Sequence, residues 1–209
     1  MARDNHAASE RAAICDLLTT LGPDQPTLCE GWTTRDLAAH LVMREGRPLA
    51  AVGLVVPPLS GRTEQARRRE AGRPYADLVD RLRHPPAWVR PVAVDRAVNT
   101  VEMYLHHEDV RRGQPGWQPR DLPASLGRVL WSRVSLPARL RLRRFPATVL
   151  IEASGCGDLR AGAGGERVHL RGEPGELALF LTGRQRAARV RLDGPEALTA
   201  RLSTARLNW

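Results

Sequence analysis

The sequence of 209 residues contains no lysine, so arginine supplies all 32 of its basic side chains apart from histidine. A GC-rich coding sequence is enough to produce this preference for arginine over lysine. With 23 acidic residues the net charge is +9, a value that on its own would suggest a nucleic-acid partner. The arginines are scattered along the chain, however, and no zinc-finger or RNA-binding motif accompanies them. We therefore expect no specific binding to nucleic acid.

Cysteine is scarce, and long apolar runs are missing. The three cysteines, Cys15, Cys29 and Cys156, lie far apart without CxxC or CxxH spacing, which excludes a disulfide scaffold and a cysteine-rich zinc module. No stretch approaches the ~18 to 20 apolar residues of a membrane-spanning helix, so a membrane protein is excluded. The only apolar run near the N-terminus carries charges, unlike a secretory signal. We expect a cytoplasmic protein.

The first two thirds of the sequence have the periodicity of amphipathic helices. Asn5 is a suitable cap for a first helix that ends at Gly22-Pro23. Thr33 and Asp36 form a capping pattern for a second helix, which is disturbed near Gly46. The Pro- and Arg-rich segment 55–91 is expected to be a crossover connection. The helices predicted after the second are a short one over 75–83 and two longer ones over 98–112 and 123–143.

The period of the pattern changes at Phe145-Pro146. Residues 147–153 and 167–171 are predicted to be strands, with a glycine-rich hairpin connection between them. A helix over 174–181, a strand over 187–192 and a closing helix over 195–202 are expected to follow. The predicted fold class is α+β: a four-helix bundle in residues 1–144, followed by a small α+β domain in residues 145–209.

The segment 98–112 carries the side chains with the clearest chemical meaning. Glu102 and His106 are four residues apart, so on a helix both lie on one face, close enough to bind one ion. A zinc site needs a third protein ligand, and His40 is suitable because it lies among alanines and leucines that should face the bundle interior. We predict a divalent metal site formed by His40, Glu102 and His106.

Simpler interpretations of the same residues are open. A Glu-xxx-His pair on a helix is commonly an exposed ion pair, and an isolated histidine such as His40 is commonly a hydrogen-bonded core residue. His107 lies about 100° around the helix from His106, so we expect it at the surface or behind the ligands. The remaining histidines, which lack partners at ligand spacing, are expected in solvent: His6, His84 and His169.

Two motifs together indicate a known family. The segments TLCEGWTTRDLAAHL (27–41) and VNTVEMYLHHEDVRR (98–112) resemble the mycothiol-dependent maleylpyruvate isomerase group of the DinB-like bundle superfamily. The segment GEPGELALFLTGR (172–184) is similar to the C-terminal α+β domain of that family. The resemblance covers most of the chain and is weak over 57–91. It implies that His40, Glu102 and His106 hold a divalent ion, normally zinc, and that mycothiol is the cosubstrate.

This resemblance implies an enzyme that uses a thiol on an electrophilic small molecule, as a mycothiol transferase or isomerase. An open position on zinc would accept a thiolate and lower the pKa of the thiol from its usual ~8.5. GC-rich genomes include those of bacteria that use mycothiol, in agreement with the absence of lysine. Two alternatives stay open: a metal-dependent amide or ester hydrolase, and a non-catalytic metal protein that binds a small ligand or partner.

Other side chains are candidates for supporting roles. Asp36 and Asp109 are each within a turn of a predicted ligand and could fix its tautomer, although Asp36 could serve only as a helix cap. Asn99 could hold the carboxylate of Glu102 by hydrogen bonding. Arg184 is the candidate for clamping an anionic group of the substrate. Cys29 could touch the metal or thiol or could belong to a hydrophobic plug; substrate identity and oligomeric state are not predicted.

Overall fold

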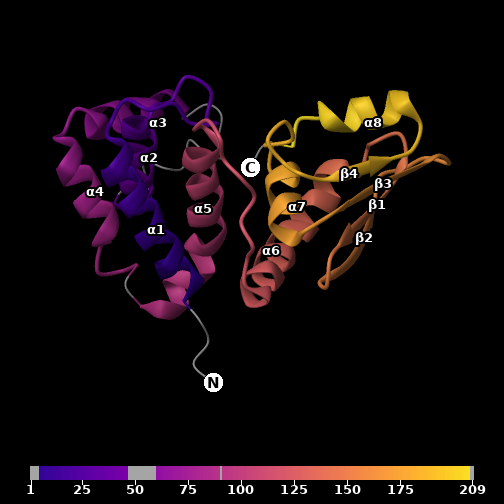
Figure 1. Ribbon diagram of the computed structural model, residues 1–209, viewed down its shortest axis with the longest axis horizontal. Helices are drawn as coiled ribbons and strands as arrows, with labels where there is room; N and C mark the ends of the chain where they lie inside the picture. Colours follow the sequence, from indigo (N-terminus) through magenta and orange to yellow (C-terminus); the bar gives the residue numbers. More distant parts are fainter. Residues whose placement is uncertain (1–4, 47–59, 90, 208–209) are drawn as a thin grey trace. The chain divides into compact units, whose positions relative to one another are not determined.

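The computed structural model describes residues 5–46, 60–89 and 91–207. The chain divides into two compact units, Met1–Gln118 and Pro119–Trp209. The described part of the first unit is helical, and the second unit combines helices with a four-stranded sheet (Figure 1). The mixed α+β class is therefore as predicted. In the described residues, no helix combines the length and the hydropathy that a membrane crossing requires.

The first two helices begin and end where the sequence predicts. In α1 (His6–Leu21) the side chain of Asn5 accepts a hydrogen bond from the backbone of Ala8, and Gly22, with φ of 76°, ends the helix. Before α2 (Thr34–Gly46), the backbone N–H of Thr33 donates to the carboxylate of Asp36 at 3.0 Å. The predicted capping pattern is thus formed.

Three further helices complete the described part of the first unit: α3 (Ser60–Ala71), α4 (Tyr75–Arg83) and α5 (Val92–Arg112). The helix α3 lies within the segment expected to be a crossover. Helix α5 begins earlier than the predicted residue 98, directly after Pro91, whose fixed φ is compatible with a helix start. The part of the expected connection in 55–59 lies outside the described residues.

The core of the first unit joins α1, α2, α4 and α5. Helix α1 packs against α5 and α4, and α2 packs against α3 and α4. The buried apolar side chains recur at helical spacing along each element, which gives every helix one face in the core. They include Ile14 and Leu18 of α1, Leu37 and Leu41 of α2, Leu78 and Leu82 of α4, and Met103 of α5.

A cluster of charged side chains is buried between the helices of this core. The guanidinium of Arg11 in α1 donates to both carboxylate oxygens of Glu45 at 2.7 Å and to Asp95 of α5 at 2.8 Å. All three residues are buried. It also donates to the backbone carbonyl of Leu82 at 3.2 Å, so the cluster ties α1 to α2, α4 and α5. We therefore expect the buried guanidinium of Arg11 to stabilise the fold of the first unit.

Replacing Arg11 with methionine should lower the free energy of unfolding by about 3 to 5 kcal/mol, because Glu45 would be left buried without its cation. Urea denaturation followed by circular dichroism measures the change. Arg83→Met is the matched control, since Arg83 forms an ion pair with Asp16 at the surface that should contribute less than about 1 kcal/mol. Equal losses in both variants would contradict the stabilising role of the buried cluster.

The second unit contains α6 (Ala124–Leu142), β1 (Thr148–Ala153), β2 (Gly157–Ala161), β3 (Arg167–Gly172), α7 (Pro174–Leu181), β4 (Arg191–Asp193) and α8 (Glu196–Ser203). The strand order is β2-β1-β3-β4. Strand β1 pairs antiparallel with β2 and parallel with β3, and β3 pairs antiparallel with β4. Helix α7 is buried on all sides, as its apolar sequence predicts, and contacts both α6 and β3.

Two features of this unit differ from the expectations. Helix α6 packs against α7 and β2, so the division of the chain falls after Gln118 and not at residue 144, and α6 is not the fourth helix of the first unit. The strands predicted as one hairpin, β1 and β3, are parallel, because the glycine-rich connection itself forms β2 between them in sequence. Helix α6 has the buried face expected of an amphipathic helix, but Leu136 lies outside that face and is 63% exposed.

Candidate metal centre

His40 lies on α2 with its ring buried and one polar atom unsatisfied. Its Nδ1 atom is buried and forms no hydrogen bond within the described part of the chain. Burial, followed by the nearby positive charge of His106, lowers the pKa of His40 to about 3. A neutral imidazole with a free lone pair is the form that binds a divalent ion. This unpartnered atom is what a ligand position would leave in a metal-free structure.

Glu102 and His106 face each other one turn apart on α5. Glu102 Oε2 lies 3.2 Å from His106 Nε2. The rings of His106 and His40 meet edge to face with centroids 5.0 Å apart. Possible ligand atoms of His40, Glu102 and His106 all lie within 4.8 Å of one another. The structure therefore brings together the three residues that the sequence analysis selected, with a donor set of two imidazoles and one carboxylate that suits zinc.

The charges at this cluster are strongly coupled. Burial opposes ionisation of Glu102, but the hydrogen bond and positive charge of His106, together with Arg44, lower the pKa of Glu102 to about 2. Burial also opposes protonation of His106, and its bonds to Asp109, Cys29 and Glu102 outweigh that effect and raise its pKa well above the ordinary value. Both directions favour the charged forms, a carboxylate at Glu102 and a protonated ring at His106.

Asp109 stands behind His106. Its Oδ2 atom lies 2.9 Å from His106 Nδ1, and the carboxylate is fully buried. A bond at Nδ1 fixes the ring so that Nε2 points to Glu102 and to the space shared with His40. The position of Asp109 is the one that a carboxylate supporting a metal-binding histidine takes.

Asp36 and Asn99 have other partners. Asp36 binds Thr33 and forms an ion pair with Arg67 of α3, so the structure shows it as a cap and a link between helices, in agreement with the simpler of its two interpretations. Asn99 does not bond to Glu102. Its amide donates to Asp95 at 2.9 Å and its Oδ1 accepts from Arg44 at 2.7 Å.

Arg44 was not selected from the sequence, although it lies next to a predicted ligand. Its Nε atom is 3.4 Å from Glu102 Oε1, the carboxylate oxygen that does not face His106. Because Arg44 is four residues after His40, helical spacing places both on one face of α2. That spacing was the signal from which Arg44 could have been found.

Trp32 lies in the loop that carries Cys29, and its ring contacts the candidate centre. The ring lies 5.2 Å from the ring of His40, and the guanidinium of Arg67 lies 4.9 Å above the same indole. Through these contacts, α3 and the loop before α2 both pack against His40, one of the candidate ligands. Trp32 thereby restricts the orientation of the His40 ring.

The surroundings of His107 differ from the prediction, whereas the role predicted for Arg184 stays a prediction. His107 was expected at the surface or behind the ligands, but it is buried and its Nδ1 lies 2.7 Å from Glu10 of α1. Helix α5 is covered by α1 on that face, which is the physical reason. Arg184 lies in the second unit, where it donates to the carbonyl of Thr182 at 2.9 Å.

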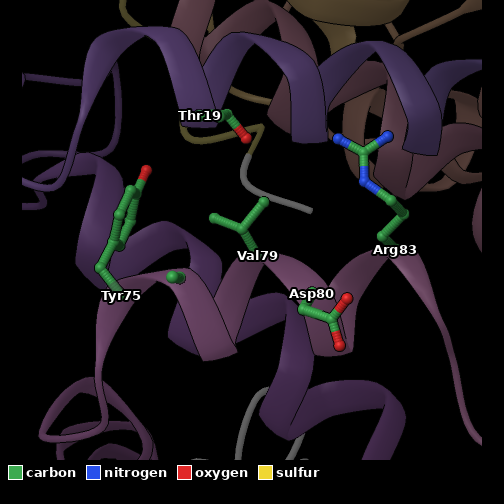
Figure 2. Close-up of a pocket in the computed structure, with 6 residues that line it drawn as sticks. Thr19, Tyr75, Val79, Asp80 and Arg83 are labelled. Atoms are coloured by element: carbon green, nitrogen blue, oxygen red, sulfur yellow. The ribbon is translucent and has the colours of Figure 1, made fainter.

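A separate cavity lies elsewhere in the first unit. It has a volume of about 340 Å³, and Figure 2 shows Val79 projecting between Tyr75 and Arg83, with Thr19 of α1 facing them. None of the three candidate ligands lines this cavity. The group of candidate ligands and the cavity of Figure 2 are therefore distinct features.

Comparisons with known proteins agree with the resemblance of the two motifs. The family model described as the mycothiol maleylpyruvate isomerase N-terminal domain matches residues 5–135, from α1 into α6. Two crystal structures of the mycothiol-dependent maleylpyruvate isomerase, one of them a histidine-to-alanine mutant, are similar with TM-scores of 0.57 and 0.62. Their identities to this chain are 14% and 15%, and each comparison covers 91% of this chain and 92% of the other.

At these identities the structural likeness concerns the fold. No curated protein matches the chain. The family model nevertheless covers more than half of the sequence and contains all three candidate ligands. The chain belongs to the family defined by the mycothiol maleylpyruvate isomerase N-terminal domain.

Proposed function

We propose that this protein is a zinc-dependent cytoplasmic enzyme that uses mycothiol on an electrophilic small molecule, as an S-transferase or as a cis–trans isomerase. The observation that carries the proposal is the buried ring of His40, which has an unpartnered Nδ1 and offers a ligand atom within 4.8 Å of those of Glu102 and His106. Membership of the family supplies the thiol and the class of reaction. A bound metal ion would account for a carboxylate, Glu102, that lies beside the two buried imidazole rings of His40 and His106.

The three side chains fit a zinc ion by the chemistry of their donors. Two imidazoles and a carboxylate leave a bound Zn²⁺ with a net charge of about +1 and one open tetrahedral position. When bound, the ion would supply a Lewis acid that favours the thiolate form of a thiol. His40 suits this role because its low pKa keeps the imidazole neutral.

Neighbouring residues would hold these ligands in place. Asp109 would accept a hydrogen bond from Nδ1–H of His106, which leaves the lone pair of Nε2 for the metal ion. Arg44 occupies Oε1 of Glu102, which leaves Oε2 on the side of His106. Trp32 packs against the ring of His40. Asp36 and Asn99 would act indirectly. Asp36 would hold Arg67, which packs on Trp32, and Asn99 would hold Arg44 beside Glu102.

We assign Arg184 of the second unit to the recognition of an anionic group on the substrate, since a guanidinium binds a carboxylate through two parallel hydrogen bonds. The reaction would begin with attack of the mycothiol sulfur on an electrophilic carbon. Loss of a leaving group gives the conjugate, whereas addition to a double bond, rotation and elimination of the thiol give the isomer. In the second case the thiol is regenerated and acts as a cosubstrate that is not consumed.

The hydrolase alternative is less well supported by the positions of the available bases. Glu108 is buried and forms ion pairs with Arg111 at 2.8 Å and Arg112 at 2.6 Å. Asp109 is bonded to His106. Both carboxylates that could activate a water molecule thus have structural partners, whereas a thiol route needs no separate base once the thiolate is formed.

Zinc-loaded protein should convert an electrophilic substrate, with maleylpyruvate tested first, only when mycothiol is present. His40→Ala should abolish the activity, because it removes a proposed ligand, and His84→Ala should leave it unchanged because His84 is exposed and bonded to Asp80. Substrate consumption and conjugate formation are followed by chromatography. Hydrolysis of an ester or amide without any thiol would instead support the alternative.

A further inference from the structure

A second group of possible ligands lies at the other nitrogen of the His106 ring. Cys29, Asp109 and His106 offer a sulfur, a carboxylate oxygen and a nitrogen within 4.8 Å of one another. Asp109 Oδ2 is 2.9 Å from His106 Nδ1 and accepts a hydrogen bond from Cys29 Sγ at 3.4 Å. Glu102 faces Nε2 of the same ring. A single imidazole therefore lies between two different donor sets.

The loop that carries Cys29 is anchored to the end of α5. The backbone N–H of Leu28 donates to the carbonyl of Asp109 at 2.9 Å. Gly113, just after α5, lies so close to this loop that a Cβ atom there would be 2.5 Å from the carbonyl oxygen of Pro26. These contacts hold Cys29 beside Asp109 in a fixed register, as a preformed ligand position requires.

We propose that Cys29, Asp109 and Nδ1 of His106 form a second cation position for a thiophilic divalent ion, such as cadmium or excess zinc. Bond lengths of about 2.0 to 2.3 Å place tetrahedral ligands about 3.3 to 3.8 Å apart, so the observed contacts need to open by less than about 1 Å. Cys29 is partly exposed and gives access, while Asp109 is buried. The set contains a thiol and thus favours softer ions than the set of His40 and Glu102.

The two positions depend on one ring. A cation at the second position replaces the proton of the Cys29 thiol and the proton on Nδ1, and both protons pass to solvent. Nε2 then keeps its proton and donates a hydrogen bond to Glu102 Oε2 across the observed 3.2 Å. Because a neutral imidazole has one free lone pair, the positions compete for His106. This second position does not use His40 or Glu102, so it does not rest on the proposed function.

Cadmium titration tests the second position. His40→Ala removes one ligand from the first set, His40, Glu102 and His106, and leaves the second set complete. In this variant without metal, Cd²⁺ should produce an ultraviolet sulfur-to-metal charge-transfer band that saturates near one ion per chain. The additional change Cys29→Ser should remove the band. Cys156→Ser in the same background is the matched control and should keep it, because Cys156 belongs to neither group of possible ligands.

The same titration of wild-type protein and of Cys29→Ser avoids dependence on the folding of His40→Ala. A band that persists in Cys29→Ser, or no band in folded wild-type protein, would overturn the second position. Zinc retained by Cys29→Ser and lost by His40→Ala would leave the proposed function intact in that case. Conversely, a Cys29-dependent band in a protein without mycothiol-dependent activity would support the second position alone.

Discussion

Replacing His106 with alanine should abolish stable binding of a divalent ion to this protein. The change removes the donor atom that faces Glu102 and leaves His40 and Glu102 on separate helices without the ring that lies against both. Loss of a group that merely supports a ligand costs about 10- to 100-fold in metal affinity, and loss of the ligand itself should cost more. Elemental analysis after dialysis should find about one zinc per chain in the wild-type protein and none in His106→Ala.

His169→Ala is the control for this experiment, because His169 is partly exposed on β3 and pairs with Glu152. It should retain the zinc content of the wild-type protein. Circular dichroism of His106→Ala establishes that the helices are still formed when the ion is lost. Full zinc occupancy in folded His106→Ala would show that the cluster of His40, Glu102 and His106 is not the metal site.

Part of the cluster could be predicted from the sequence because two of its residues are close together in the chain. Glu102 and His106 are separated by one helical turn, and that separation alone predicts a shared face. His40 required more, since its place opposite α5 depends on how two helices pack. The resemblance of segments 27–41 and 98–112 to the family supplied this long-range relation, and the structure brings the residues within 4.8 Å.

Contacts over long sequence distances were the ones that the sequence could not predict. Nothing local to His107 indicates that Glu10 of α1 would bury it, and nothing local to Asp109 indicates the approach of Cys29. The same holds for α6: its apolar stripe shows that one face is buried, but it does not specify α7 and β2 as the surfaces that cover it. Amphipathic periodicity determines an element and its face, whereas its partner depends on the whole chain.

Helix α3 is rich in charged residues and was not predicted from the sequence. The sequence SGRTEQARRREA has few apolar side chains, so the segment was expected to be part of a connection. In the structure Arg67 is buried through its ion pairs with Asp36 and Glu64 and its contact with Trp32. A helix that attaches by charged side chains over an aromatic ring has no apolar stripe for a periodicity argument to detect.

A thiol should become the fourth ligand of the ion at the first position, which is the set of His40, Glu102 and His106. This is the most direct test of the proposed chemistry. Soft thiolate sulfur is a preferred ligand of zinc and of cobalt, and the first set leaves one tetrahedral position for it. The titration uses cobalt-loaded Cys29→Ser, so that mycothiol is the only sulfur able to reach the ion from either side of His106. Cys156→Ser is loaded in parallel as the matched control.

Adding mycothiol should then produce an intense near-ultraviolet sulfur-to-metal band and release about one proton per site, because binding requires the deprotonated thiol. An analogue with oxygen in place of the sulfur should do neither, and His40→Ala should show neither effect. If mycothiol leaves the spectrum unchanged while an ester or amide perturbs it, thiol transfer is wrong and the open position serves hydrolysis. A spectrum that responds to none of these compounds would favour a structural role for the ion, since a structural zinc site has a closed coordination sphere.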